Sequence, residues 1–146
     1  MPHRLPFRLV ILAIAILKLS SCGGREVAVT DLDQLVGLWG AETPSGMTSV
    51  LEIRSDGTID VAGGWERYDA GSVYSFAISV EDGKVWFQGP LECGEDVGTY
   101  EAVIGPDSIL RLSVVEDPCS FRRRIIDKSQ PGNLQQYELE YSRVER

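Results

Sequence analysis

The chain has 146 residues, of which 43% are hydrophobic and 25% are charged. This composition excludes a collagen-like or disordered chain, and the length suits one domain with a single core. The formal net charge is −8, and because an acidic surface repels phosphate backbones, the composition argues against nucleic-acid binding.

The first 21 residues have the pattern of a secretory signal peptide. Arg4 and Arg8 precede an apolar run at 9–17, and Lys18 ends that run. A basic segment before a short apolar stretch is typical of an exported leader, and the run is shorter than the roughly 20 residues that a membrane-spanning helix needs. We predict a signal peptide at 1–21. Its removal takes away three of the 14 basic residues and none of the 22 acidic ones, which leaves a net charge of −11.

The segment Leu19-Ser20-Ser21-Cys22 resembles the lipobox of bacterial lipoproteins. The resemblance implies cleavage before Cys22 and acylation of its thiol, which would attach the protein to the cell membrane or outer membrane, facing the periplasm or the exterior. Two or three acyl chains, at about 0.8 kcal/mol per buried CH₂, anchor a protein stably. Gly23 and Gly24 follow, so we predict a lipidated cysteine and flexible tether at 22–34 and a folded domain at 35–146.

Apolar and polar residues alternate with a period of two through most of the domain, which predicts β-strands. The first strand is expected at Val36 to Trp39, which open the domain. Alternation at 51–53 and 59–61 surrounds a Ser-Asp-Gly turn, and alternation at 74–80 and 85–87 surrounds a Glu-Asp-Gly turn. Each arrangement predicts a hairpin.

The remaining strands follow the same pattern. Alternation at 100–104 and 110–114 predicts a third hairpin, residues 121–126 are expected to form a strand, and 137–141 form the last one. About eight strands joined as sequential neighbours predict an all-β antiparallel meander closed into a barrel. A β-sandwich is the alternative.

Cysteine and histidine usage restricts the chemistry. With Cys22 lipidated, Cys93 and Cys119 remain, and outside the cytoplasm an even pair predicts a disulfide, worth on the order of 3 kcal/mol for a loop of this length. Two buried free thiols are the alternative. The only histidine, His3, leaves with the leader. Histidine-dependent triads and zinc sites are therefore excluded from the mature protein, and we predict that it is not an enzyme.

Two short motifs carry a further resemblance. Gly37-Leu38-Trp39 resembles the Gly-x-Trp that opens the first strand of lipocalins and related calycin barrels. In that family the tryptophan plugs the closed end of the barrel, and an arginine from a late strand packs across its ring. The resemblance makes Trp39 the plug and either Arg122 or Arg124 the arginine. The segment from Asp117 to Arg122 is also similar to the D-P-C-x-x-R segment of small lipocalin-like bacterial lipoproteins of uncharacterised function.

Aromatic residues are the candidates for ligand contact. Tyr74 and Trp86, together with Trp39 and Trp65, are placed to line a cavity for an apolar ligand. Aromatic side chains at alternating positions of a small barrel more often fill its interior, so a filled core is the simpler interpretation.

Acidic residues gather beside both cysteines of the predicted disulfide. These are Glu92, Glu95, Asp96, Glu116 and Asp117. Calcium sites use six to eight oxygens, usually with a glycine-punctuated spacing, and the sequence has no such repeat. We predict solvated loop charge, with no metal and no cofactor.

These features predict a membrane-anchored extracytoplasmic lipoprotein whose lipocalin-like domain binds a small apolar ligand or a component of the cell envelope. Two alternatives stay open. The first is a protein-binding lipoprotein, such as an inhibitor of a basic enzyme similar to the acidic barrel lipoproteins that restrain lysozyme, and its support is the charge of the mature chain. The second is a purely structural envelope protein.

Overall fold

The structure is a computed structural model that describes residues 24–42, 48–126 and 139–146. The predicted signal peptide, the predicted lipidation site Cys22 and Tyr137 of the last predicted strand lie outside these residues. The described strands are β1 (Val27–Ala28), β2 (Gly37–Glu42), β3 (Thr48–Ile53), β4 (Thr58–Ala62), β5 (Tyr74–Glu81), β6 (Lys84–Gln88), β7 (Val97–Ile104), β8 (Ile109–Glu116) and β9 (Glu140–Val144). The described helices are η1 (Leu32–Gln34), α1 (Trp65–Asp69), η2 (Leu91–Cys93) and α2 (Ser120–Ile126).

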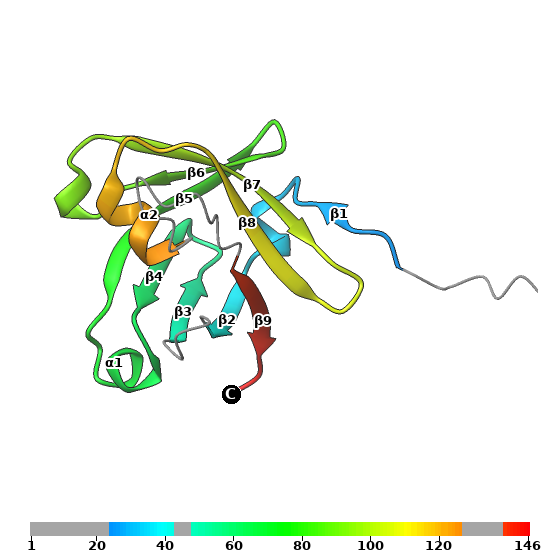
Figure 1. Ribbon diagram of the computed structural model, residues 1–146, viewed down its shortest axis with the longest axis horizontal. Coiled ribbons are helices and arrows are strands. Elements are labelled where there is room, and N and C mark those ends of the chain that lie inside the picture. Colours follow the sequence, from blue (N-terminus) through cyan, green and yellow to red (C-terminus); the bar gives the residue numbers. More distant parts are fainter. Residues whose placement is uncertain (1–23, 43–47, 127–138) are drawn as a thin grey trace, which may run out of the picture.

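Eight of these strands close into an antiparallel barrel. Strands β2 to β9 pair as sequential neighbours, and β9 completes the circle by pairing with both β8 and β2. Strand β1 is added outside the circle, where it pairs with the end of β7 (Figure 1). The predicted meander and barrel are confirmed, and the sandwich alternative is wrong.

Turn chemistry fixes the register of the predicted hairpins. In the β3–β4 turn, the Asp56 carboxylate accepts a hydrogen bond from the backbone N–H of Thr58 (3.0 Å), and Gly57 has a φ of 81°. Asp82 and Gly83 form the β5–β6 turn with φ angles of 51° and 71°, as a two-residue hairpin of this type requires. Short polar residues and glycine are the residues that adopt these angles at low cost.

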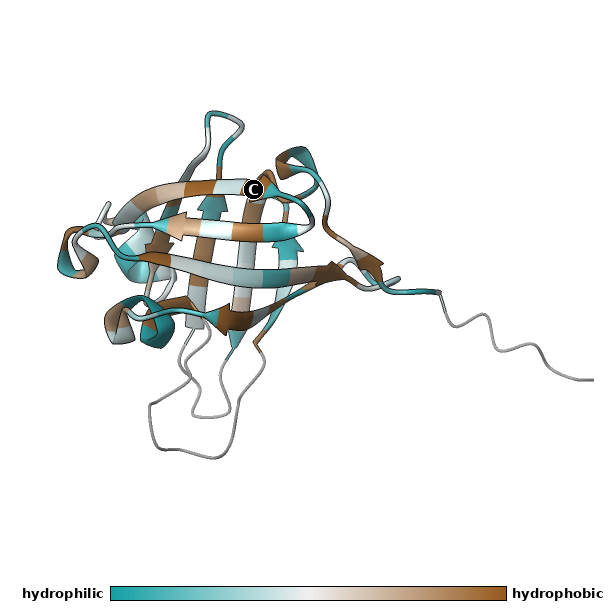
Figure 2. Ribbon diagram, turned by 90° about the horizontal axis from the view of Figure 1, so that it is seen from above, coloured by the Kyte–Doolittle hydropathy of each residue, from teal (hydrophilic) through white to brown (hydrophobic). Residues whose placement is uncertain are grey.

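Hydrophobic and hydrophilic residues alternate along several strands (Figure 2), and the buried positions are mostly the hydrophobic ones. Phe76, Phe87 and Tyr100 from three adjacent strands pack edge to face in the interior, with ring centroids 6.0 and 5.0 Å apart. Trp39 and Tyr141 are also fully buried. Large side chains therefore occupy the interior positions of the described strands.

The expected strand at 121–126 is wrong, because these residues belong to α2. Arg122 and Ile126 are buried while Arg124 is exposed, and burial of residues four apart is helical periodicity. Residues 27–34 of the predicted tether form β1 and η1, and Val29 between them is fully buried. The folded part therefore begins before residue 35. No helix among the described residues is long and apolar enough to cross a membrane.

Candidate functional site

Trp39 lies at one end of the barrel and is covered by an arginine. Its side chain is fully buried, and its indole Nε1–H donates a hydrogen bond to the backbone oxygen of Leu35 (2.8 Å). The guanidinium carbon of Arg143 lies 4.6 Å from the ring centroid. Arg143 also donates hydrogen bonds to the backbone oxygens of Val36 and Gln34, each 3.1 Å long.

The expected partner of Trp39 was therefore wrong, since neither Arg122 nor Arg124 lies over the ring. The pairing of β2 with β9 sets Trp39 directly opposite Arg143, which explains how the last strand supplies the cation. The sequence held a signal for this residue, because Arg143 follows the buried Tyr141 by two positions on a strand. Arg124 is exposed instead and lies 5.9 Å from the ring centroid of Phe121.

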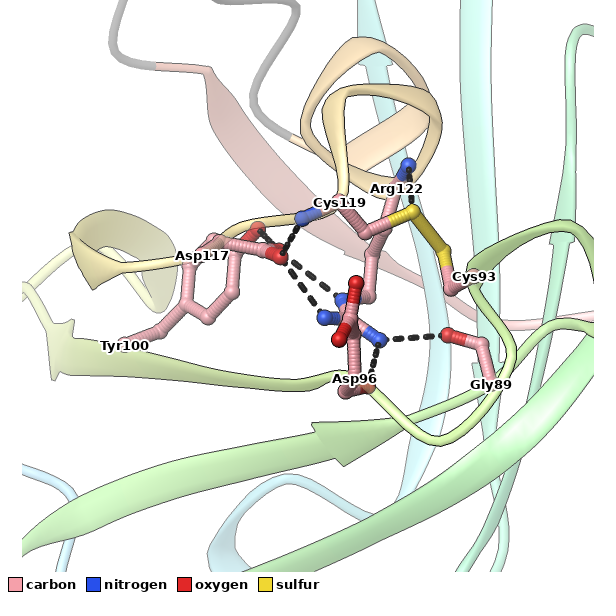
Figure 3. The surroundings of a disulfide bond; sticks show 7 residues. All are labelled: Gly89, Cys93, Asp96, Tyr100, Asp117, Cys119 and Arg122. Carbon is pink, nitrogen blue, oxygen red and sulfur yellow. Dashed lines mark hydrogen bonds and ion pairs between the residues drawn. A yellow bond between two sulfur atoms is a disulfide. The ribbon is translucent and has the colours of Figure 1, made fainter.

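Arg122 is fully buried in a polar network at the opposite end of the barrel (Figure 3). Its Nε and Nη2 donate to the two carboxylate oxygens of Asp117 at 2.8 and 2.6 Å. Its Nη1 donates to the backbone oxygens of Gly89 and Asp96 at 2.6 and 2.9 Å. The guanidinium thus connects the segment before α2 with the β6–β7 connection.

The Asp117 carboxylate is satisfied from several sides. It accepts hydrogen bonds from the Tyr100 hydroxyl (2.6 Å) and from the backbone N–H of Cys119 (2.9 Å), besides those from Arg122. Burial on its own would raise the pKa of Asp117, but the hydrogen bonds from Arg122, Tyr100 and Cys119 outweigh burial and lower that pKa below its usual value. The carboxylate is therefore held in its charged form.

Close packing leaves little room around this ion pair. A Cβ on Gly98 would lie 2.6 Å from Asp117 Oδ2 and 2.9 Å from Arg122 Nε. The predicted disulfide is present beside the pair, joining Cys93 and Cys119 with their Cα atoms 5.4 Å apart (Figure 3). The bond ties η2 to the residues that precede α2. This cluster is fully coordinated within the protein, which suits a structural role.

Of the four predicted cavity-lining aromatics, only Trp39 belongs to the core, and Tyr74, Trp65 and Trp86 lie outside it. Trp86 points outward from β6, between the buried Val85 and Phe87, and is 37% exposed. Tyr74 lies at the start of β5, with its ring centroid 5.0 Å from that of Phe121 in α2. The cavity-lining prediction is wrong for Trp86. Because its neighbours Val85 and Phe87 both face the interior, alternation along the strand turns Trp86 outward.

Trp65 also lies on the outside. Its ring covers Gly40 of β2, where an added Cβ would lie 3.0 Å from the ring, and the guanidinium carbon of Arg146 is 4.2 Å from its ring centroid. Trp65 and Trp86 each border a recess of the outer surface. The recess at Trp86 has a volume of about 300 Å³, and the recess at Trp65 has a volume of about 440 Å³.

The acidic residues near the disulfide divide into two groups. Asp117 faces the interior and is neutralised by Arg122. Glu92, Glu95, Asp96 and Glu116 are exposed, and none of them forms an ion pair within the described residues. The described residues hold no group of three or more histidine, cysteine or acidic side chains arranged to bind a metal ion.

Comparison with known proteins found no relative of this chain. No protein-family model, no curated protein and no solved structure matches this chain.

Proposed function

We propose that this chain is a lipid-anchored extracytoplasmic binding protein without catalytic activity, and that its partner is a basic protein bound on the outer surface of the barrel. The observation that carries the proposal is the distribution of aromatic side chains. Trp39, Phe87, Tyr100 and Tyr141 are fully buried inside, whereas Trp86 is left partly exposed on the outside at the edge of a recess. Exposed aromatic side chains are enriched at protein interfaces.

The same distribution weakens the case for a small apolar ligand in the barrel. Such a ligand would need interior side chains that it could contact. The largest described interior side chains are instead fully buried, and the ring of Phe87 packs against those of Phe76 and Tyr100. A partner that binds on the outside needs no change in this packing.

Charge favours a basic partner. The mature chain left after cleavage at Cys22 carries −11, and several of its carboxylates have no cationic neighbour among the described residues. A surface of one sign steers partners of the opposite sign and raises their association rate. Nucleic acids and anionic lipid headgroups are disfavoured by the same charge.

The experiment is a binding measurement with a basic probe protein. The full chain in detergent micelles is immobilised, and lysozyme is compared with lysozyme whose lysines have been acetylated, in salt from about 0.01 to about 1 M, over which the Debye length falls from about 30 to about 3 Å. We expect saturable binding of native lysozyme that weakens with salt, and much weaker binding of the acetylated form.

Two results would contradict the proposal. One is equal binding, or no binding, of the two lysozyme forms at low salt. The other is stoichiometric, salt-independent binding of an apolar fluorescent probe such as anilinonaphthalene sulfonate, because that behaviour is expected of a ligand cavity inside the barrel.

A further inference from the structure

We infer that the basic partner docks on one particular face of the barrel, the outer surface of β5, β6 and β7 around Trp86. This inference rests on the proposed function and assigns it a site. We call this surface the Trp86 face and define it by its outward-pointing residues, which are Ala77, Ser79, Trp86, Gln88, Val97 and Thr99.

Strand register makes the Trp86 face a continuous uncharged platform. Trp86 pairs with Ser79 on one side and with Thr99 on the other, which forms one row across three strands. Gln88 lies between Ala77 and Val97 in the next row. Trp86 and Val97 are 37% and 41% exposed. An aromatic residue at the centre of a small-residue platform is a typical anchor for a protein partner.

Carboxylates without ion pairs surround this platform. Glu81 borders the recess at Trp86, and Glu116 pairs with Thr99 at the next strand. Glu92, Glu95 and Asp96 lie in the β6–β7 connection, next to Leu91, which is 95% exposed. The one cation among the outward residues of β5 to β7, Lys84, is already paired with Glu101. A centre with exposed apolar side chains, bordered by carboxylates that form no ion pair among the described residues, is complementary to an apolar side chain flanked by lysine or arginine.

The β6–β7 connection, which carries Glu92, Glu95 and Asp96, is held in place by hydrogen bonds and a disulfide. Arg122 binds the backbone oxygens of Gly89 and Asp96, on either side of η2, and the disulfide fixes Cys93 between them. A loop that is already ordered loses little conformational entropy when a partner binds. The Arg122 hydrogen bonds and the disulfide therefore hold the connection that carries Glu92 and Glu95.

The path of the N-terminal segment directs this connection away from the lipid anchor. Gly24 lies against Pro106 in the β7–β8 hairpin, where an added Cβ would be 2.2 Å from Pro106 Cβ. An anchor at Cys22 would lie within about 7 Å of Gly24, because each residue spans at most about 3.6 Å. Glu81 lies in the β5–β6 hairpin, but Glu92, Glu95 and Asp96 lie at the other end of the eight-residue strand β7, about 27 Å away at the usual rise per residue. A protein in the aqueous phase, rather than the lipid surface, is therefore the partner that reaches these three residues.

The recess at Trp65 is the natural comparison, because β2 lies four strands from β6 in the eight-strand circle. There the aromatic ring is already covered by the cationic Arg146, which repels a basic partner. This opposite side also has three exposed carboxylates without ion pairs among the described residues, Glu42, Glu66 and Glu145. They provide a control set with the same change in charge.

The test compares two triple variants of the full chain in detergent micelles, with lysozyme and cytochrome c as basic probes at low salt. We expect Glu92→Gln/Glu95→Gln/Glu116→Gln to raise Kd about tenfold or more, and Glu42→Gln/Glu66→Gln/Glu145→Gln to change it less than about twofold. Trp86→Ala is expected to raise Kd about tenfold. Val97→Lys, which adds positive charge to the face, should weaken binding as well. Unchanged circular dichroism and melting temperature confirm that each variant is folded.

The outcomes separate the site from the proposed function. If neither probe binds the wild-type chain, the proposed function is wrong, and the site with it. If the wild type binds but the two triple variants weaken binding equally, the attraction is diffuse and the Trp86 face is not the site. The site is also overturned if folded Trp86→Ala and Val97→Lys variants both bind as tightly as the wild type.

Discussion

Each end of the barrel is closed by an arginine, and the two arginines work in different ways. Arg143 lies over Trp39, donates to backbone oxygens and is exposed to solvent. Arg122 is fully buried in a bidentate pair with Asp117, beside a disulfide. The exposed cation adds to a plug that hydrophobic burial already stabilises, whereas the buried cation is indispensable to the carboxylate it neutralises. The second end is also the one that carries the acidic β6–β7 connection.

The largest expected effect is the loss of the buried cation. Arg122→Met leaves the Asp117 carboxylate buried without its partner, and we expect the free energy of unfolding to fall by about 3 to 5 kcal/mol. The matched variant Arg122→Met/Asp117→Leu removes both charges and should recover much of that loss. Urea denaturation measures both. If the free energy of unfolding of Arg122→Met lay within about 1 kcal/mol of the wild-type value, the pair would not be important for stability.

A methyl group added at Gly98, beside the Arg122–Asp117 pair, should have the next largest effect on stability. Gly98→Ala places a Cβ 2.6 Å from Asp117 Oδ2, and we expect a loss of about 1 to 3 kcal/mol from overpacking. Gly63→Ala is the control, because nothing lies within 4 Å of a Cβ at Gly63. Thermal unfolding of the two variants gives the comparison, and equal melting temperatures would show that the end at Arg122 is more loosely packed than described.

Acid should weaken the end at Arg122 selectively. Because the pKa of Asp117 is lowered in the folded state, its stabilising contribution is present above the unfolded value of about 3.9 and is lost as pH falls through the folded value. We therefore expect the wild type to lose more stability below about pH 4 than Arg122→Met/Asp117→Leu does. Urea midpoints measured from neutral to acid pH test this. Parallel curves would assign the acid sensitivity to other carboxylates.

The smallest loss of stability is expected from substitutions at the Trp39 end of the barrel. Arg143→Met removes the cation over Trp39 but leaves the ring buried, so the expected loss is about 0.5 to 1 kcal/mol. Arg143→Lys keeps the positive charge and should therefore lose less stability than Arg143→Met. Near-ultraviolet circular dichroism reports the environment of the indole. A loss as large as that of Arg122→Met would remove the distinction between the two ends.

The sequence predicted the barrel but missed the arginine that lies over Trp39. Gly37 and Trp39 form a local motif, and two-residue alternation gives strand number and hairpin turns without tertiary information. Alternation places Arg143 on the same strand face as Tyr141, but its pairing with Trp39 joins residues far apart in the chain, so local patterns do not identify this partner. Residues 121–126 alternate no better as a strand than as a helix, and the burial of Arg122 and Ile126, four residues apart, fits the helix. The disulfide was predictable because it needed only a count of cysteines and a compartment.

Trp86 was expected to face the interior of the barrel, although it lies on the outside. Val85 and Phe87 are both buried, and strand alternation places Trp86 between them on the outside. Its grouping with interior aromatics followed from residue type rather than from position. Exposed aromatic residues on strands are better sought where both neighbours are apolar.

Amide hydrogen exchange of the full chain in micelles, with and without saturating lysozyme, shows directly whether the partner docks on the Trp86 face. We expect slower exchange on binding in 84–101, which spans β6, η2 and the first half of β7, and unchanged exchange in β2 and β9. Protection confined to β2 and β9, or no protection in 84–101 despite binding, would contradict it.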